Sequence, residues 1–206
     1  MSTAITRELA SNPEILYRMS VEEYHRMIES GVLEEGVPFE LLDGHVVRKI
    51  RGKAGEDPMT INPDHATAVG LLSDLNERLK KLGCHMRAQQ PITLPPFDEP
   101  EPDGAVVRGT LKDYATHHPQ AKDVHCVIEV ADASLARDRG YKQQLYATAG
   151  IGTYLIIVLV NKTIEVYTRP MKGGYAPPTV LSGKQKVTIP AGRARRLTVS
   201  VAELLP

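Results

Sequence analysis

The sequence is poor in the residues that usually announce a binding platform or a covalent framework. Among 206 residues there are no tryptophans, two phenylalanines and two cysteines. The lack of tryptophan and the small number of phenylalanines leave little material for a platform on which the bases of a single strand could stack. The cysteines, Cys84 and Cys126, both lie in apolar segments. They predict neither a disulfide framework nor a zinc site.

The chain also lacks a net charge and a long apolar run. Its 25 Lys and Arg residues balance 25 Asp and Glu residues, so any surface for nucleic acid must be local. The longest apolar run, from Tyr154 to Val160, is too short to cross a bilayer. The N-terminal stretch MSTAITRELA lacks the apolar core of a signal peptide. We therefore expect a cytoplasmic protein.

The pattern of elements predicts a single α/β domain. Residues 1–15 show no periodicity and are expected to form a flexible arm, with one domain over residues 16–206. Ser20 followed by Glu23 is a capping box, which predicts a helix that ends at Gly31. Helices and strands alternate in the first half and hairpins dominate the second, as is typical of a mixed β-sheet flanked by helices.

Turn and cap residues delimit the other predicted elements. They are a hairpin around Asp43-Gly44, a polar loop over 51–61, one helix between Asn62 and Gly83, a strand in RAQQPITL broken at Pro91, the strands DGAVV and DVHCVIEVA, a helix near Leu135–Ala149, a hairpin around Asn161-Lys162, and a final strand pair with a terminal turn.

The stretch VIEVADAS places a carboxylate inside a strand that is apolar on both faces. Val127, Glu129 and Ala131 share one face, whereas Ile128 and Val130 share the other. A strand of this kind is typically covered by helices on both sides. Burying a carboxylate without a partner costs several kcal/mol, roughly, so Glu129 is either a solvent-facing residue or part of a site.

Two further residues favour the second interpretation. Asp103 begins the apolar strand DGAVV, and a carboxylate there could form an acidic pocket with Glu129 that attracts a hard divalent cation. Lys142 lies four residues after Asp138 and four before Tyr146, on one helical face. It either forms a surface pair with Asp138 or turns its ammonium group toward Glu129.

The ordered set FELLDGHVV, PDGAVV, VIEVADAS, DRGYKQQLYATAGIGTYLIIV and IEVYTRP resembles the Uma family of restriction endonucleases. That family belongs to the PD-(D/E)XK nuclease superfamily. The resemblance covers the chain from about Tyr17 to its end. It implies a restriction-endonuclease-like core, with a central mixed β-sheet flanked by helices and an active site at one end of the central strands.

The resemblance also implies a set of site residues. Asp103 and Glu129 would be the metal-ligating acids, with the backbone carbonyl of Val130 as a further ligand for Mg²⁺ or Mn²⁺. The superfamily's usual lysine two residues after the glutamate is replaced here by Ala131, and Lys142 on the following helix matches the family pattern instead. Glu40 in FELLDG matches another carboxylate of the site, or is a solvent-facing hairpin residue.

The implied reaction is metal-dependent hydrolysis of a phosphodiester, with DNA as the expected substrate and RNA or a smaller phosphodiester as alternatives. The alternative function is a weakly active or inactive module of the same fold that binds nucleic acid or a protein partner. A homodimer is expected, since it suits the cleavage of two strands. Either the apolar hairpin from Tyr154 to Tyr167 or the C-terminal tail could form its interface. Candidate contacts to nucleic acid are Arg48, Lys49, Arg51, His65 and Gln90.

Overall fold

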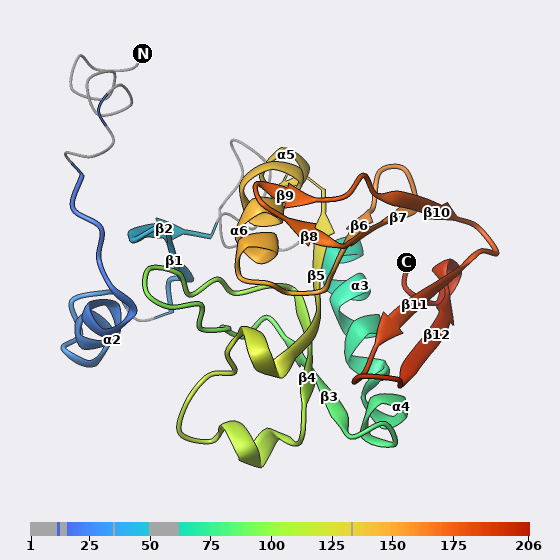
Figure 1. Ribbon diagram of the computed structural model, residues 1–206, viewed down its shortest axis with the longest axis horizontal. Coiled ribbons are helices and arrows are strands. Elements are labelled where there is room, and N and C mark those ends of the chain that lie inside the picture. The colour runs from blue at the N-terminus through green and yellow to red at the C-terminus, as the bar shows by residue number, and fades with distance from the viewer. Residues whose placement is uncertain (1–11, 13–15, 35, 50–61, 133) are drawn as a thin grey trace. The chain divides into compact units, whose positions relative to one another are not determined.

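Figure 1 shows the computed structural model of the chain, which describes residues 12, 16–34, 36–49, 62–132 and 134–206. These residues form two compact units. The N-terminal unit comprises the described residues up to 49 together with Leu94–Pro100, and the C-terminal unit comprises those from 62 to 93 together with Glu101–Pro206. The single domain over 16–206 stays a prediction. The polar loop over 51–61, and the expected arm except for residue 12, lie outside the described residues.

The N-terminal unit consists of a helix and a hairpin, both as predicted. Helix α2 (Val21–Glu29) begins with the capping box, in which the Ser20 hydroxyl accepts from the Glu23 amide at 3.2 Å and the Glu23 carboxylate accepts from the Ser20 amide at 2.8 Å. Strands β1 (Phe39–Leu42) and β2 (His45–Arg48) pair antiparallel. The turn between them has positive φ at both Asp43 (52°) and Gly44 (75°), which is the conformation that an Asp-Gly hairpin turn requires.

The C-terminal unit is built on a six-stranded mixed sheet with the spatial order β10-β7-β6-β5-β4-β3. The strands are β3 (Cys84–Ala88), β4 (Gly104–Arg108), β5 (Val124–Ala131), β6 (Thr153–Val158), β7 (Thr163–Thr168) and β10 (Thr179–Ser182). Only β5 and β6 pair parallel. Parallel neighbours need a crossover, which here is the helical stretch α5 (Leu135–Arg137), η4 (Asp138–Lys142) and α6 (Gln143–Thr148).

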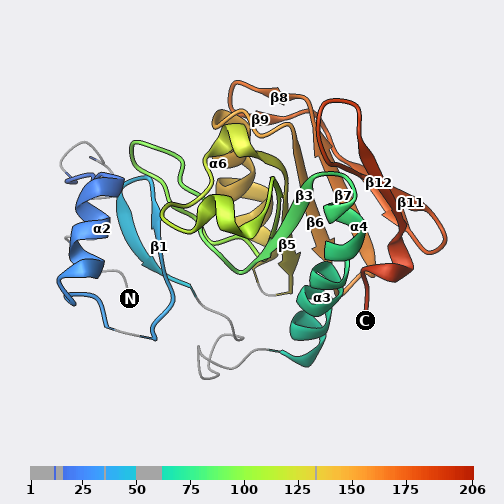
Figure 2. The same ribbon diagram turned by 90° about the horizontal axis from the view of Figure 1, so that it is seen from below.

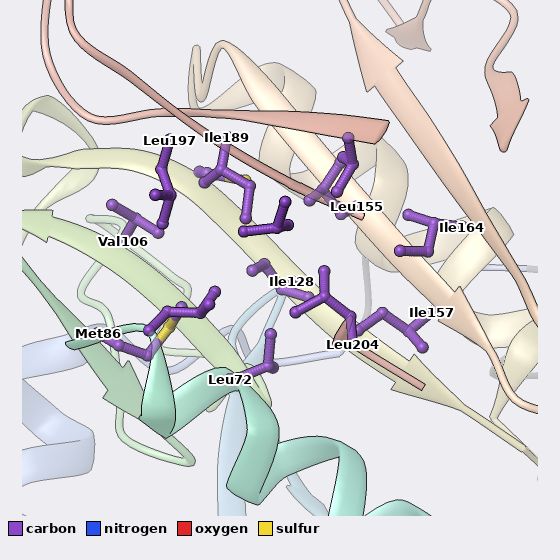
Figure 3. Close-up of a cluster of buried hydrophobic side chains, with 14 of the residues drawn as sticks. Leu72, Met86, Val106, Ile128, Leu155, Ile157, Ile164, Ile189, Leu197 and Leu204 are labelled. Carbon is purple, nitrogen blue, oxygen red and sulfur yellow. The ribbon is translucent and has the colours of Figure 1, made fainter. Parts of the chain in front are cut away.

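Both faces of this sheet are covered, as Figures 1 and 2 show. Helices α3 (Pro63–Asp74) and α4 (Asn76–Lys80) and the hairpin of β11 (Lys186–Pro190) and β12 (Arg196–Ser200) lie on one side, and α6 lies on the other. The largest apolar core is on the first side, where Leu72 packs with Ile128, Leu155 and Ile189 (Figure 3). The described part of the chain contains no helix that could cross a membrane.

The second side is lined by tyrosines. Tyr154 lies within 5.1–6.2 Å, between ring centroids, of Tyr146, Tyr167 and Tyr175. Tyr175 comes from β9 (Gly174–Tyr175), which pairs with β8 (Pro170–Met171). The alternation along β5 is therefore as expected, since Ile128 and Val130 face the apolar core and Glu129 faces the layer that contains α6. The apolar hairpin of β6 and β7 lies inside the sheet and Val160 in its turn is exposed, so its part in a dimer interface stays a prediction.

Two predicted elements differ from the structure. The helix expected between Asn62 and Gly83 is divided at Leu75, and the Asn76 side chain accepts a hydrogen bond from the Met86 amide at 2.8 Å, which ties the break to β3. The strand expected in RAQQPITL lies earlier, since β3 ends at Ala88. The next residue, Gln89, has φ of 50°, a conformation that no regular strand contains.

Candidate active site

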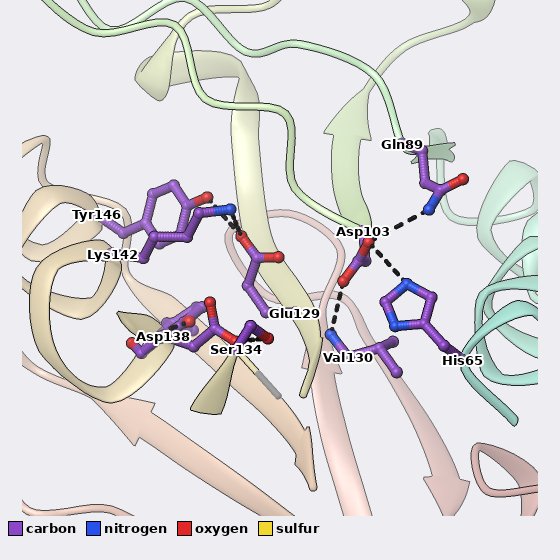
Figure 4. A network of polar contacts seen from close by, with 10 residues as sticks. His65, Gln89, Asp103, Glu129, Val130, Ser134, Asp138, Lys142 and Tyr146 are labelled. Atoms are coloured by element: carbon purple, nitrogen blue, oxygen red, sulfur yellow. Dashed lines mark hydrogen bonds and ion pairs between the residues drawn. The ribbon is translucent and has the colours of Figure 1, made fainter. Parts of the chain in front are cut away.

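Asp103 and Glu129 lie on neighbouring strands at the same end of the sheet. Gly104 pairs with Ile128, so Asp103, just before β4, lies beside the stretch of β5 that carries Glu129. Asp103 is 3% exposed and Glu129 is 2% exposed. Figure 4 shows the two carboxylates between α3 on one side and the η4–α6 helix on the other. The sheet thus brings together two buried acids that are 26 residues apart in the sequence.

Asp103 is held by donors from three different elements. The backbone amide of Val130 donates to Oδ2 at 2.9 Å. On Oδ1, His65 Nε2 from α3 lies at 3.2 Å, and the Gln89 side-chain amide donates at 3.4 Å. The left-handed backbone at Gln89 follows directly after β3, and such strained conformations are concentrated at functional sites. These contacts orient the carboxylate at the end of the strands.

Glu129 is held from the covering helix. Lys142 Nζ donates to Oε1 at 2.9 Å and the Tyr146 hydroxyl donates to the same oxygen at 2.8 Å. Lys142 is only 1% exposed, so this is a buried ion pair rather than a surface pair with Asp138. Figure 4 shows the other oxygen of Glu129 pointing away from these two donors. A buried carboxylate is stable in this strand because a cation and a hydroxyl lie against it.

The helix that carries Lys142 contains a π-helical turn. The turn, η4, spans Asp138–Lys142 and separates two short α-helical pieces. Such turns are frequent at functional sites, because the extra residue changes the direction of the side chains that follow it. The sequence predicts the helix but not the turn.

Asp138 is a third buried carboxylate beside this site. It is 1% exposed and accepts a hydrogen bond from the Ser134 hydroxyl at 2.5 Å. Burial raises the pKa of Asp138, and the positive charge of Lys142 opposes the rise. Lys142 therefore interacts with two carboxylates. It forms a direct ion pair with Glu129, and its positive charge limits the rise in the pKa of Asp138. Neither Asp138 nor Ser134 is predicted as a site residue from the sequence. Asp138 lies four residues before Lys142, a spacing that an ordinary surface ion pair on a helix also has.

The donor set suits a hard divalent cation with few protein ligands. Asp103 and Glu129 offer carboxylate oxygens, the donors that Mg²⁺ prefers, and Mg²⁺ commonly binds through one or two carboxylates and keeps several waters. Within the described ranges, no three His, Cys, Asp or Glu side chains gather closely enough to bind a metal by themselves. A metal at this site would thus be held by the two acids, a backbone carbonyl and solvent.

The remaining predicted site residues fall into different parts of the chain. Glu40 lies on β1 in the N-terminal unit and is completely buried, so it is no solvent-facing residue, and its membership of the site stays a prediction. In the same unit Arg48 is exposed and Lys49 is buried. Arg51 lies outside the described residues. In the C-terminal unit Gln90 is exposed.

His65 has a different position from the one favoured by the sequence. Its place in the first turn of α3 favours an ordinary polar residue there, yet its ring lies against Asp103 and is 19% exposed. The contact between His65 and Asp103 could have been predicted from the position of α3, because this helix begins at the same end of the sheet as Asp103. A helix start at that edge brings a first-turn side chain to the acids.

Comparison with known proteins agrees with this architecture. The crystal structure described as that of a "putative nuclease belonging to DUF820" from Anabaena variabilis superposes with a TM-score of 0.65, covering 90% of this chain and 97% of that chain at 14% identity. The fold is thus that of a nuclease-like α/β protein. The model of the Uma2 family, described as "Putative restriction endonuclease", matches residues 21–202, and the chain belongs to this family. No curated protein matches the sequence.

Proposed function

We propose that the protein is a metal-dependent endonuclease that hydrolyses phosphodiester bonds of DNA. The observation that carries the proposal is the buried pair Asp103 and Glu129 at one end of the sheet, with Lys142 Nζ 2.9 Å from Glu129. A module that only binds has no need for two acids and a lysine buried together. Membership of the Uma2 family, described as "Putative restriction endonuclease", supports the same reaction class.

Each residue has a role that follows from its contacts. Asp103 and Glu129 would hold the cation, with the Val130 carbonyl as a further ligand. A bound Mg²⁺ or Mn²⁺ supplies an activated water and offsets charge that develops on the phosphate. Lys142 would orient that water and add positive charge near the phosphate. His65 and the Val130 amide would keep the Asp103 carboxylate directed at the cation.

The proposal is tested by DNA cleavage with near-isosteric variants. Plasmid, linear duplex and single-stranded DNA are incubated with the protein in Mg²⁺, Mn²⁺ or EDTA. We expect cleavage that EDTA abolishes and that Asp103→Asn and Glu129→Gln each reduce by at least about 100-fold. The control is Asp74→Asn, which makes the same change at an exposed position on α3 and should cut like the parent. Equal cleavage by all four proteins would refute the assigned site.

The oligomeric state forms a second part of the proposal. A homodimer would present two active sites to the two strands of a duplex, and two-fold dimers are the commonest oligomers. Size-exclusion chromatography with light scattering gives the mass directly. A mass of one chain at every concentration, with duplex cleavage intact, would refute the dimer and leave the enzyme activity standing.

A further inference from the structure

Arg87 is a buried cation that no carboxylate of the described chain neutralises. It lies on β3, between Met86 in the apolar core and Ala88, and its side chain faces the opposite side of the sheet from Met86. It is 5% exposed, and none of the described residues forms a hydrogen bond with its Nε. Arg87 Nη2 lies 3.3 Å from His118 Nδ1. Arginines are almost never buried to this degree without an anionic partner.

The surroundings of Arg87 do not offset its charge. The guanidinium can only donate, so His118 Nδ1 accepts in this contact and brings no negative charge to Arg87. His85 lies two residues before Arg87 on the same face, with Nδ1 3.0 Å from the Gly109 carbonyl. Its buried Nε2 has no partner in the part of the chain that the structure describes. Burial lowers the pKa of both Arg87 and His85. A structural role for Arg87, joining β3 to the segment that carries His118, would explain one hydrogen bond but not the buried charge.

The position of Arg87 connects it to the two acids. Arg87 pairs with Ala105 across β3 and β4, and Asp103 lies two residues from Ala105. The Gln89 amide donates to the Asp103 carbonyl at 3.2 Å, so the pairing continues to Asp103. Diagonal neighbours of this kind lie roughly 7–8 Å apart in an antiparallel pair. One nucleic-acid strand could therefore contact both places at once.

We propose that Arg87, with His118 beside it, binds a backbone phosphate of the nucleic acid next to the phosphate at Asp103 and Glu129. The inference rests on the proposed function and specifies how its substrate is held. A guanidinium matches two phosphate oxygens at once, which a lysine in the same place cannot do. Since only 5% of Arg87 is exposed, binding requires a rearrangement of the segment that carries His118.

The test measures the salt dependence of binding. The affinity of a fluorescent duplex is measured by anisotropy in EDTA over a range of KCl concentrations, for the parent protein, Arg87→Met and Arg87→Lys. The control is Arg78→Met. It removes the same charge from a half-exposed arginine on α4 that pairs with Glu203. Circular dichroism and thermal denaturation show which variants fold.

Loss of one phosphate contact lowers the slope of log Kd against log salt by about 0.9. We expect this change, with about tenfold weaker binding, for Arg87→Met and an unchanged slope for Arg78→Met. Arg87→Lys should keep the slope and lose part of the affinity. If Arg87→Met does not fold, Arg87→Lys decides the test, and full affinity of Arg87→Lys then overturns the inference. An unchanged slope in folded Arg87→Met also overturns it, and Arg87 is then a structural residue.

A second measurement separates this inference from the proposed function. The melting temperature of the parent protein is compared in sodium phosphate and in sodium chloride at equal ionic strength. If the parent neither binds nor cuts DNA, the proposed function fails. The site for a phosphate then stands only if phosphate raises the melting temperature of the parent by more than that of Arg87→Lys. An equal melting temperature in both salts in that case overturns the site as well.

Discussion

Replacing Lys142 by methionine should destabilise the protein strongly, and the structure gives the reason. The substitution keeps the length of the side chain but removes the ammonium group 2.9 Å from Glu129 Oε1. Glu129 and Asp138 would then be buried acids without a cation between them. Breaking a buried pair from one side costs about 3–5 kcal/mol, much more than losing a surface pair.

The expected cost is a large part of the total stability. Domains of this size unfold with about 5–15 kcal/mol, and 1 kcal/mol shifts the melting temperature by about 2–4 °C. We therefore expect Lys142→Met to melt about 6–20 °C below the parent. Burial already raises the pKa of Asp138 and Lys142 opposes the rise, so this pKa should rise further in the variant. A folded protein with an acid of raised pKa loses stability as the pH rises above the pKa of that acid in the unfolded chain, about 3.9. The deficit should therefore be larger at neutral pH than at pH 4.

The assay is urea denaturation followed by far-ultraviolet circular dichroism, since the chain has no tryptophan to report by fluorescence. Glu129→Gln and the double variant with Lys142→Met complete a thermodynamic cycle. Removing both partners should cost less than the sum of the single changes, with a coupling free energy of about 1–3 kcal/mol. A Lys142→Met protein as stable as the parent, or additive single changes, would refute the buried pair.

Three other changes test other parts of the structure. Burial and three nearby arginines lower the pKa of His125, so the unfolded chain takes up its proton first as the pH falls below about 6.5. From pH 7.5 to pH 5.5 the free energy of unfolding, measured with urea, should fall more for the parent than for His125→Gln. Equal losses would contradict the lowered pKa of His125. Tyr146→Phe removes a 2.8 Å bond to Glu129 and should cost about 1.5–3 kcal/mol by thermal denaturation, whereas no loss would mean that water replaces the hydroxyl. Gly104→Ala would place a methyl group 3.0 Å from Leu72 Cδ1 and should cost about 1–3 kcal/mol by urea, unless Leu72 can move.

Local signals predicted most of the elements. The capping box at Ser20 and the turn at Asp43-Gly44 depend on side chains close in sequence, and both occur as expected. The divided helix at Leu75 was not predictable in this way, because its break is tied by Asn76 to a strand ten residues on. The end of β3 at Ala88 likewise depends on how Gln89 meets Asp103. Tertiary contacts decide such boundaries, and no local pattern contains them.

The site shows the same division between local and non-local information. The burial of Glu129 follows from two apolar faces on one strand, and its proximity to Asp103 follows from the family resemblance and is seen in the strand pairing. The contact of His65 with Asp103 does not follow from its neighbours in sequence, whereas Ser134 and Asp138 are only four residues apart, the local spacing of about one helical turn. His65 reaches Asp103 because α3 begins at the site end of the sheet, and Ser134 reaches Asp138 across the start of the helix.

The place of the lysine shows how one chemical requirement can be met from different elements. In the superfamily motif the lysine lies two residues after the glutamate, on the same strand and the same face. Here that position is Ala131, which is fully buried, and the ammonium comes from the covering helix instead. The π-helical turn ends at Lys142, so the extra residue in the turn sets the direction of this side chain. The ammonium group beside Glu129 therefore comes from the helix that covers the strand and not from the strand itself.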